Sequence, residues 1–189
     1  MKQDYEQKQT EYAKVREKEV ETLIAFLLGH TKLSGENCLV AGCGVGAEAR
    51  VLARLYKEVL AIDHDAAQVE IAKKLGGTNI VYNVADVHRW LLEYPHEPMF
   101  DLLTVFDVDT NLFLEQILES ASPLLRKNGK IIVTERSANS KIYGRMLLLP
   151  LVEKIKKSMS KNFYAQLFQR SLSTEPNKDA IVLVLTKVA

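Results

Sequence analysis

The sequence predicts a single α/β domain with a doubly wound, mostly parallel sheet of seven strands that ends in an antiparallel hairpin. Short apolar runs alternate with helical stretches along most of the 189 residues. Runs such as 102–106 and 131–133 are continuously apolar, which indicates strands covered by helices on both faces. Such alternation of strands and helices builds a parallel sheet with right-handed crossovers.

Residues 1–28 predict the first helix, because charged residues fill its first two thirds and apolar residues close it before Gly29, which fits a helix stop. Tyr5 and Tyr12 are seven residues apart and therefore share one helix face. Apolar runs predict strands at 37–42, 58–62, 79–83, 101–107 and 130–135. Helices between and after these strands are expected at 46–57, 66–75, 87–93, 111–126 and 142–160.

The end of the chain departs from this alternation. Residues 162–170 and 180–187 are strand-like, and the loop 171–179 between them leaves no room for a helix. Two strands joined in this way are expected to pair antiparallel. The apolar stretch 142–152 that precedes them is expected either in the core or as a cover over a substrate site.

Composition and charge are typical of one folded domain, residues 1–189. The 25 basic and 24 acidic side chains give a net charge of +1, so the charge does not imply a nucleic-acid partner. It does not exclude one either, because a local basic patch can exist at this net charge. No apolar run reaches the roughly 18 residues of a membrane span, and the first residues carry no apolar signal core. Cys38 and Cys43 are too far apart in an extended chain for a disulfide, so a cytoplasmic location is expected. The sequence does not indicate an oligomeric state.

The strongest functional pattern lies in residues 38–46, where an apolar strand runs into Gly42, Gly44 and Gly46 and a helix follows. A second apolar run ends on Asp63, 21 residues after Gly42. Glycine lets backbone approach a ligand where a Cβ atom would collide, and the new helix presents free N–H groups. A carboxylate at the next strand end can accept hydrogen bonds from both hydroxyls of a ribose. The pattern predicts a nucleotide-binding site.

Further carboxylates are expected on the same edge of the sheet. Asp86 and Asp107 follow predicted strands, as Gly42 and Asp63 do. Ligands of doubly wound sheets bind beyond the carboxyl ends of the strands, where the strand order reverses. Asp65 is better placed than Asp63 to cap the next helix, which leaves Asp63 for a ligand.

These features resemble the class I S-adenosylmethionine (SAM)-dependent methyltransferases over nearly the whole chain. In that family the first loop reads Gly-x-Gly-x-Gly, an acidic residue ending the second strand binds the ribose, and an Asp after the third strand lies near the adenine. The resemblance implies the family's Rossmann-like seven-stranded fold, S-adenosyl-L-methionine as the cofactor, and methyltransferase activity. Residues 125–129 also resemble the family's Leu-x-x-Gly-Gly turn, with Asn128 at the first glycine position.

The same resemblance implies a set of cofactor-binding residues. The glycines would approach the methionine and ribose, Asp63 would hold the ribose hydroxyls, Asp86 and Val87 would meet the adenine, and Phe106 would face the methyl-transfer zone. The expected set is Gly42, Cys43, Gly44, Gly46, Asp63, His64, Asp86, Val87 and Phe106. Residues 1–30 are expected to pack on this site or cover it. No catalytic base is assigned, because only an acceptor that is protonated at working pH needs one.

Two positions depart from related patterns. Val40 stands where the family usually has an acidic residue that organises the methionine end, so either another group holds that end or affinity is weak. Asp107 and Asp109 match half of a metal-dependent catechol-type pattern, but Glu135 and Arg136 stand where its second half would be. A hard cation needs several oxygen ligands, so no metal site is expected.

The sequence thus predicts methyl transfer to a small-molecule acceptor, because it lacks both the Asn-Pro-Pro-Tyr type of motif of adenine methyltransferases and a separate nucleic-acid-binding domain. RNA and metal-dependent catechol-type acceptors are less favoured. Two other classes stay open. Gly42, Gly44 and Ala47 also fit the dinucleotide fingerprint of an NAD(P)-dependent oxidoreductase. Val40 and the lack of an obvious base leave open a second alternative, a non-catalytic SAM-binding protein.

Overall fold

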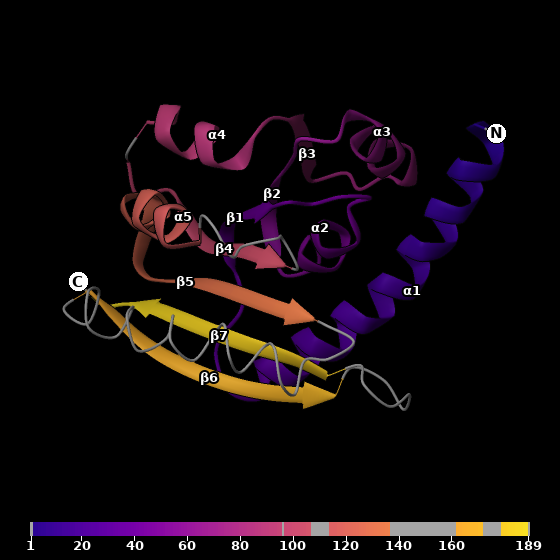
Figure 1. Ribbon diagram of the computed structural model, residues 1–189. Helices are drawn as coiled ribbons and strands as arrows, with labels where there is room; N and C mark the ends of the chain where they lie inside the picture. Colours follow the sequence, from indigo (N-terminus) through magenta and orange to yellow (C-terminus); the bar gives the residue numbers. More distant parts are fainter. Residues whose placement is uncertain (1, 96, 107–113, 137–161, 172–178, 189) are drawn as a thin grey trace.

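The computed structural model describes residues 2–95, 97–106, 114–136, 162–171 and 179–188, and its strands form one twisted sheet (Figure 1). The order of the seven strands is β3-β2-β1-β4-β5-β7-β6. The five neighbouring strands β3, β2, β1, β4 and β5 pair in parallel. Strand β7 pairs antiparallel with both β5 and β6, which confirms the predicted sheet and its terminal hairpin. The strands are β1 (Gly35–Ala41), β2 (Tyr56–Asp63), β3 (Ile80–Val84), β4 (Phe100–Phe106), β5 (Leu125–Arg136), β6 (Phe163–Ser171) and β7 (Asp179–Lys187).

Helices cover both faces of the sheet, and each face has its own apolar core (Figure 1). The first core lies under α1 and α2 with part of α3, and the second lies under α4 and α5. The helices are α1 (Lys2–Leu28), α2 (Ala47–Leu52), α3 (Ala66–Leu75), α4 (Val87–Glu93), α5 (Leu114–Ala121) and the short 3-10 helix η1 (Ser122–Leu124).

Strand β1 shows why the central runs are continuously apolar. Cys38 and Val40 point into the first core, whereas Leu39 and Ala41 point into the second. All four are at most 1% exposed. Because both faces are covered, neither set of alternating positions tolerates a polar residue without a partner.

Helix α2 is shorter than the predicted helix over 46–57. It ends at Leu52, and β2 begins at Tyr56 instead of residue 58. The Leu55 amide donates to the Leu52 carbonyl over 2.8 Å, which closes a turn, and the buried Tyr56 pairs with Gly35 of β1. Tertiary burial of Tyr56 therefore ends the helix earlier than local pattern indicates.

The predicted helix over 111–126 also ends early. Within the described residues α5 stops at Ala121 and η1 follows, with Pro123 in its first turn. Proline has no N–H to donate and disfavours a helical residue before it. Leu125 is then free to begin β5, five residues ahead of the predicted strand, where it pairs with Phe100.

The irregular stretch of β5 between Leu125 and Lys130 contains Asn128, which stands where the resembled pattern has its first glycine. Asn128 has a φ angle of 66°, which is the left-handed region. Asparagine tolerates this region better than other residues with a Cβ atom. Gly129 follows, and a Cβ atom there would lie 2.8 Å from the Arg126 carbonyl oxygen. The left-handed angle at Asn128 thus suits a position where the resembled pattern has glycine.

Helix α1 runs beside α3 and α2 and reaches the hairpin strands (Figure 1). Near its end, the rings of Phe26 and His30 pack against Phe168 of β6. Tyr5 and Tyr12 are largely exposed, so neither packs in a core. No helix in the described ranges is long and apolar enough to cross a membrane. The predicted helix over 142–160 lies outside the described residues.

Candidate functional site

The strand order reverses beside β1, which lies between β2 and β4. The helices that follow β1 and β4, α2 and α5, cover opposite faces of the sheet, and doubly wound folds bind ligands where the strand order reverses in this way. The structure brings predicted site residues to this edge: Gly42 follows β1, Asp63 ends β2, Asp86 follows β3 and Phe106 ends β4. Asp107 and Asp109 lie outside the described residues.

The glycine loop, defined here as residues 42–46, has three residues in the left-handed region. The φ angles are 74° at Gly42, 50° at Gly44 and 77° at Gly46. The amides of Gly42 and Cys43 both donate to the Ile62 carbonyl of β2, over 2.8 and 2.9 Å. Only glycine adopts three such angles in five residues without strain.

Close packing beneath the loop also requires glycine. A Cβ atom on Gly46 would lie 2.6 Å from the Tyr82 hydroxyl oxygen and 3.0 Å from the Ala72 Cβ. A Cβ atom on Gly44 would lie 2.9 Å from Oε1 of Gln68. Gly46 is therefore needed for the loop to rest on β3 and α3, whereas the flexible Gln68 side chain could move aside for a Cβ atom at Gly44.

Asp63 fastens the loop to β2. Its Oδ2 accepts a hydrogen bond from the Gly44 amide over 2.7 Å, and its Oδ1 accepts one from the Asp65 amide over 2.9 Å. The residue is only 7% exposed. An ionised carboxylate has about four acceptor positions, so these two bonds leave capacity for hydroxyl donors. Asp63 therefore fits a ribose while already holding the loop in place.

Asp65 caps α3, as the sequence predicts. Its Oδ1 accepts from the amides of Ala67 and Gln68, and its Oδ2 accepts from the Gln68 side chain over 3.0 Å. The Gln68 side-chain bond, followed by the two backbone bonds, lowers the pKa of Asp65. Asp63 is therefore not needed to cap α3.

His64, Asp86 and Val87 border the same edge. The His64 side chain is 85% exposed, and its Nδ1 lies 3.4 Å from Oδ1 of Asp63. Asp86 is exposed and caps α4 by accepting from the Arg89 amide over 2.8 Å. Val87 is half-buried against the second core. The Asp86 carboxylate can accept a further donor, and its place beside an adenine amino group stays a prediction.

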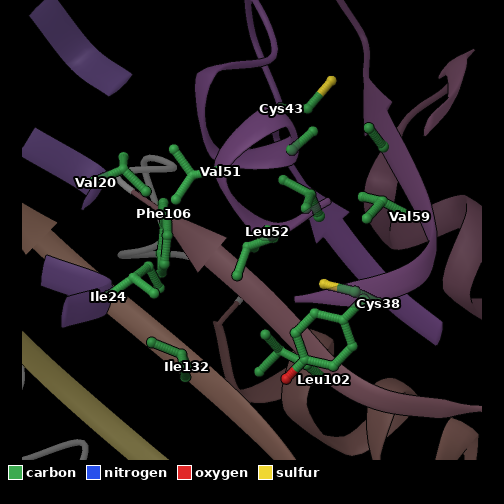
Figure 2. Close-up of a cluster of buried hydrophobic side chains, with 14 of the residues drawn as sticks. Val20, Ile24, Cys38, Cys43, Val51, Leu52, Val59, Leu102, Phe106 and Ile132 are labelled. Atoms are coloured by element: carbon green, nitrogen blue, oxygen red, sulfur yellow. The ribbon is translucent and has the colours of Figure 1, made fainter. Parts of the chain in front are cut away.

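The side chains of Cys43 and Phe106 are buried in the first core. Burial raises the pKa of the Cys43 thiol to about 12, and the carboxylates of Asp63 and Glu48 add to the effect. The thiol is therefore neutral near pH 7 and is no nucleophile. Phe106 packs in the first core against Val20 and Val51, as Figure 2 shows. Either residue would reach a ligand at this edge through its backbone.

The sequence predicts that residues 1–30 pack on the site or cover it, but it does not identify the residues that link α1 to the loop. The Arg50 guanidinium of α2 bonds to the Glu17 carboxylate of α1 and to the Val45 carbonyl of the loop. Glu17 and Glu21 are four residues apart on α1, and their partners Arg50 and Arg54 are four apart near α2. This matched spacing of opposite charges is the pattern that could have revealed the contact.

The described residues contain no group of three or more His, Cys, Asp or Glu side chains that could hold a metal ion. Both cysteines, Cys38 and Cys43, are buried free thiols. Val40, at the usual acidic position, is buried in the first core. The described part of the site therefore offers Asp63, His64, Asp86 and loop backbone as polar groups.

Comparison with known proteins places this edge in context. A family model described as a methyltransferase domain matches residues 39–133, which run from β1 into β5. The mitochondrial ubiquinone biosynthesis O-methyltransferase of Schizosaccharomyces pombe is 28% identical over 135 residues, covering 65% of this chain and 45% of that protein. The chain thus spans less than half the length of this curated relative.

Solved structures share the fold. The N-methyltransferase NodS from Bradyrhizobium japonicum superposes with a TM-score of 0.67 at 19% identity, covering 92% of this chain and 96% of that one. An rRNA methylase from Streptococcus thermophilus gives 0.63 at 20% identity, covering 83% and 90%. Magnesium protoporphyrin IX methyltransferase from Synechocystis, solved with bound S-adenosylhomocysteine (SAH), gives 0.63 at 16% identity, covering 92% and 83%.

Proposed function

Because the chain belongs to the methyltransferase-domain family, whose cofactor is S-adenosyl-L-methionine, we propose that it transfers a methyl group from this cofactor to a small-molecule acceptor. The observation that carries the proposal is the glycine loop tied to Asp63 at the point where the strand order reverses. Both lie within the matched residues 39–133. We further propose that residues 1–189 act as one SAM-binding domain, with residues 1–30 packed against the site.

The described residues fit the cofactor. Asp63 would accept hydrogen bonds from the ribose hydroxyls, and its bonds to Gly44 and Asp65 hold it in position for that role. The loop 42–46 would approach the methionine and ribose without a Cβ atom in the way. Asp86 and Val87 would border the adenine. Val40 offers no carboxylate, so other groups of the chain would hold the methionine end.

When bound, the cofactor supplies an electrophilic methyl group on a sulfonium. The chain's own task is then to orient the acceptor in line and to exclude water. A base is needed only where the acceptor is protonated at working pH. Cys43 does not serve as one, because its neutral thiol is buried.

Two observations favour a small acceptor. The curated relative is named for ubiquinone biosynthesis, whose substrates are small molecules. The net charge of +1 gives no overall attraction to a polyanion. An RNA acceptor is the second candidate, because an rRNA methylase shares the fold.

Calorimetric titration of the purified protein with SAH, SAM and NAD tests the cofactor. We expect heat from SAH and SAM and none from NAD. Binding of NAD alone would show an oxidoreductase. Transfer of labelled methyl groups is then measured with panels of phenols, amines and thiols and with total RNA. Label in a small acceptor supports the proposal, label only in RNA overturns the acceptor class, and cofactor binding without any transfer would show a non-catalytic SAM-binding protein.

A further inference from the structure

We propose that α1 positions the glycine loop for the cofactor, and that Glu17 and Arg50 are the positioning residues through which it does so. This inference rests on the proposed function, because it concerns the same loop. It assigns the N-terminal helix a defined mechanical part in cofactor affinity, without requiring it to touch the ligand.

A single guanidinium links helix and loop. Nε of Arg50 donates to the Glu17 carboxylate, and Nη1 of Arg50 donates to the Val45 carbonyl oxygen over 2.8 Å. The Arg50 side chain is 12% exposed and that of Glu17 is 26% exposed, so solvent screens the pair only in part. Arginine suits this bridge because its planar fork directs separate N–H groups at separate acceptors.

The side chain of Val45 makes a second, independent link. Val45 packs in a small apolar cluster with Ala13 of α1 and Ile71 of α3, and all three are buried. This cluster is separate from the two main cores. Val45, the residue before Gly46 in the loop, is therefore held by its carbonyl through Arg50 and by its side chain between two helices.

Helix α1 is itself firmly anchored, so it can transmit this restraint. Nε of Arg16 lies 2.6 Å from Oε1 of Glu48, and both side chains are buried. Towards the start of the helix, Lys74 of α3 pairs with Glu6 over 3.0 Å. Figure 1 shows the helix lying along α3 and α2. Glu17 is thus fixed relative to the elements that flank the loop.

The physical benefit follows from the glycines. Glycine loses more conformational freedom on ordering than any other residue, and the loop has three of them in five positions. A loop that is already ordered in the free protein loses less conformational entropy when the cofactor binds. Restraint of Val45 from α1 therefore raises affinity by preorganisation.

The test compares Glu17→Gln and Arg50→Lys with Glu21→Gln. Glu21 lies one turn further along α1 and pairs with Arg54, which makes no hydrogen bond to the loop within the described residues, so it is the matched control. Two quantities are measured: the Kd for SAH, and the amide hydrogen exchange of Gly44 and Gly46 in the ligand-free protein. Melting temperature records the purely structural effect.

We expect Glu17→Gln and Arg50→Lys to raise the Kd about three- to tenfold and to speed exchange at Gly44 and Gly46, whereas Glu21→Gln leaves both at the wild-type values. If the two variants lower the melting temperature but match Glu21→Gln in Kd and exchange, the contact is merely structural and the inference is wrong. If the wild type does not bind SAH, the proposed function fails, and the exchange measurement alone decides whether α1 positions the loop.

Discussion

Oδ2 of Asp63 lies 2.7 Å from the amide nitrogen of Gly44, so the carboxylate expected to hold the ribose also holds the loop. The two roles are joined in one side chain. A substitution that removes the Asp63 carboxylate weakens the restraint on Gly44 together with the expected contact to the ribose, so its effect on binding would include both losses.

Replacement of Asp63 by Asn is therefore expected to weaken SAH binding about ten- to hundredfold, which corresponds to about 1.5–3 kcal/mol for a charge-assisted hydrogen bond. Calorimetry measures the change. Asp65→Asn is the control, because Asn also caps helices well and should leave the Kd near the wild-type value. Equal affinity of Asp63→Asn and wild type would contradict the assigned role.

Introduction of a methyl group at Gly46 should destabilise the fold. In Gly46→Ala the new Cβ would lie 2.6 Å from the Tyr82 hydroxyl, at a φ angle of 77°. We expect the free energy of unfolding in urea to fall by about 2–4 kcal/mol, from left-handed strain and overpacking together.

Tyr82→Phe provides the matched partner for that experiment. The Tyr82 hydroxyl is buried and makes no hydrogen bond of normal geometry within the described residues, although the Arg50 guanidinium lies close enough to act on it electrostatically, so its removal should change stability by less than about 1 kcal/mol. Combined with Gly46→Ala it should restore part of the lost stability. If the double variant is no more stable than Gly46→Ala, the clash with Tyr82 is not the cause.

Native Cys43 should resist thiol reagents at pH 8. Burial raises its pKa from the ordinary 9.0 to about 12, so almost no thiolate is present and access is closed. Ellman's reagent should react with neither Cys43 nor the buried Cys38 until the protein is denatured. Rapid labelling of the native protein would contradict the buried position of the loop cysteine.

The same shift predicts a dependence of stability on pH. The folded state holds the Cys43 pKa above the unfolded value, so it favours the protonated thiol. That contribution is fully present below about pH 9 and is lost as the pH rises towards 12. Unfolding free energies of wild type and Cys43→Ala, compared from pH 8 to 10.5, should converge as the pH increases. A constant difference would argue against the shift.

Asn128 should accept glycine but not valine. Its φ angle of 66° lies in the left-handed region, where a β-branched side chain costs about 1–2 kcal/mol. Chemical denaturation should show Asn128→Gly within about 0.5 kcal/mol of wild type and Asn128→Val clearly less stable. Equal stability of both variants would indicate that the turn relaxes.

Much of the fold follows from local pattern. Continuous apolar runs predict β1 and β4 because both faces of these strands are covered, and Asp65 is recognisable as a cap because it directly precedes α3. Gly42, Gly44 and Gly46 predict the loop because only glycine adopts its left-handed angles readily.

Other features depend on contacts that local pattern does not contain. The end of α2 is set by the burial of Tyr56 against β1, and the start of β5 by the pairing of Leu125 with Phe100. The bond from Gly44 to Asp63 spans 19 positions, and the contact of Glu17 with Arg50 spans 33. Identifying these pairs requires the folded chain, although the matched spacing of Glu17 and Glu21 with Arg50 and Arg54 is a sequence signal for the second contact.

Strand β7 has a consequence for the order in which the molecule can assemble. It lies between β5 and β6, although a ribosome makes it after both. Until residues 179–187 emerge, β5 presents an unpaired edge that includes Ile131, Ile132 and Val133, and such an edge is a template for aggregation. Closure of this side of the sheet is therefore a late event of biosynthesis, and nascent chains that stall before residue 179 are the ones that chaperones would need to shield.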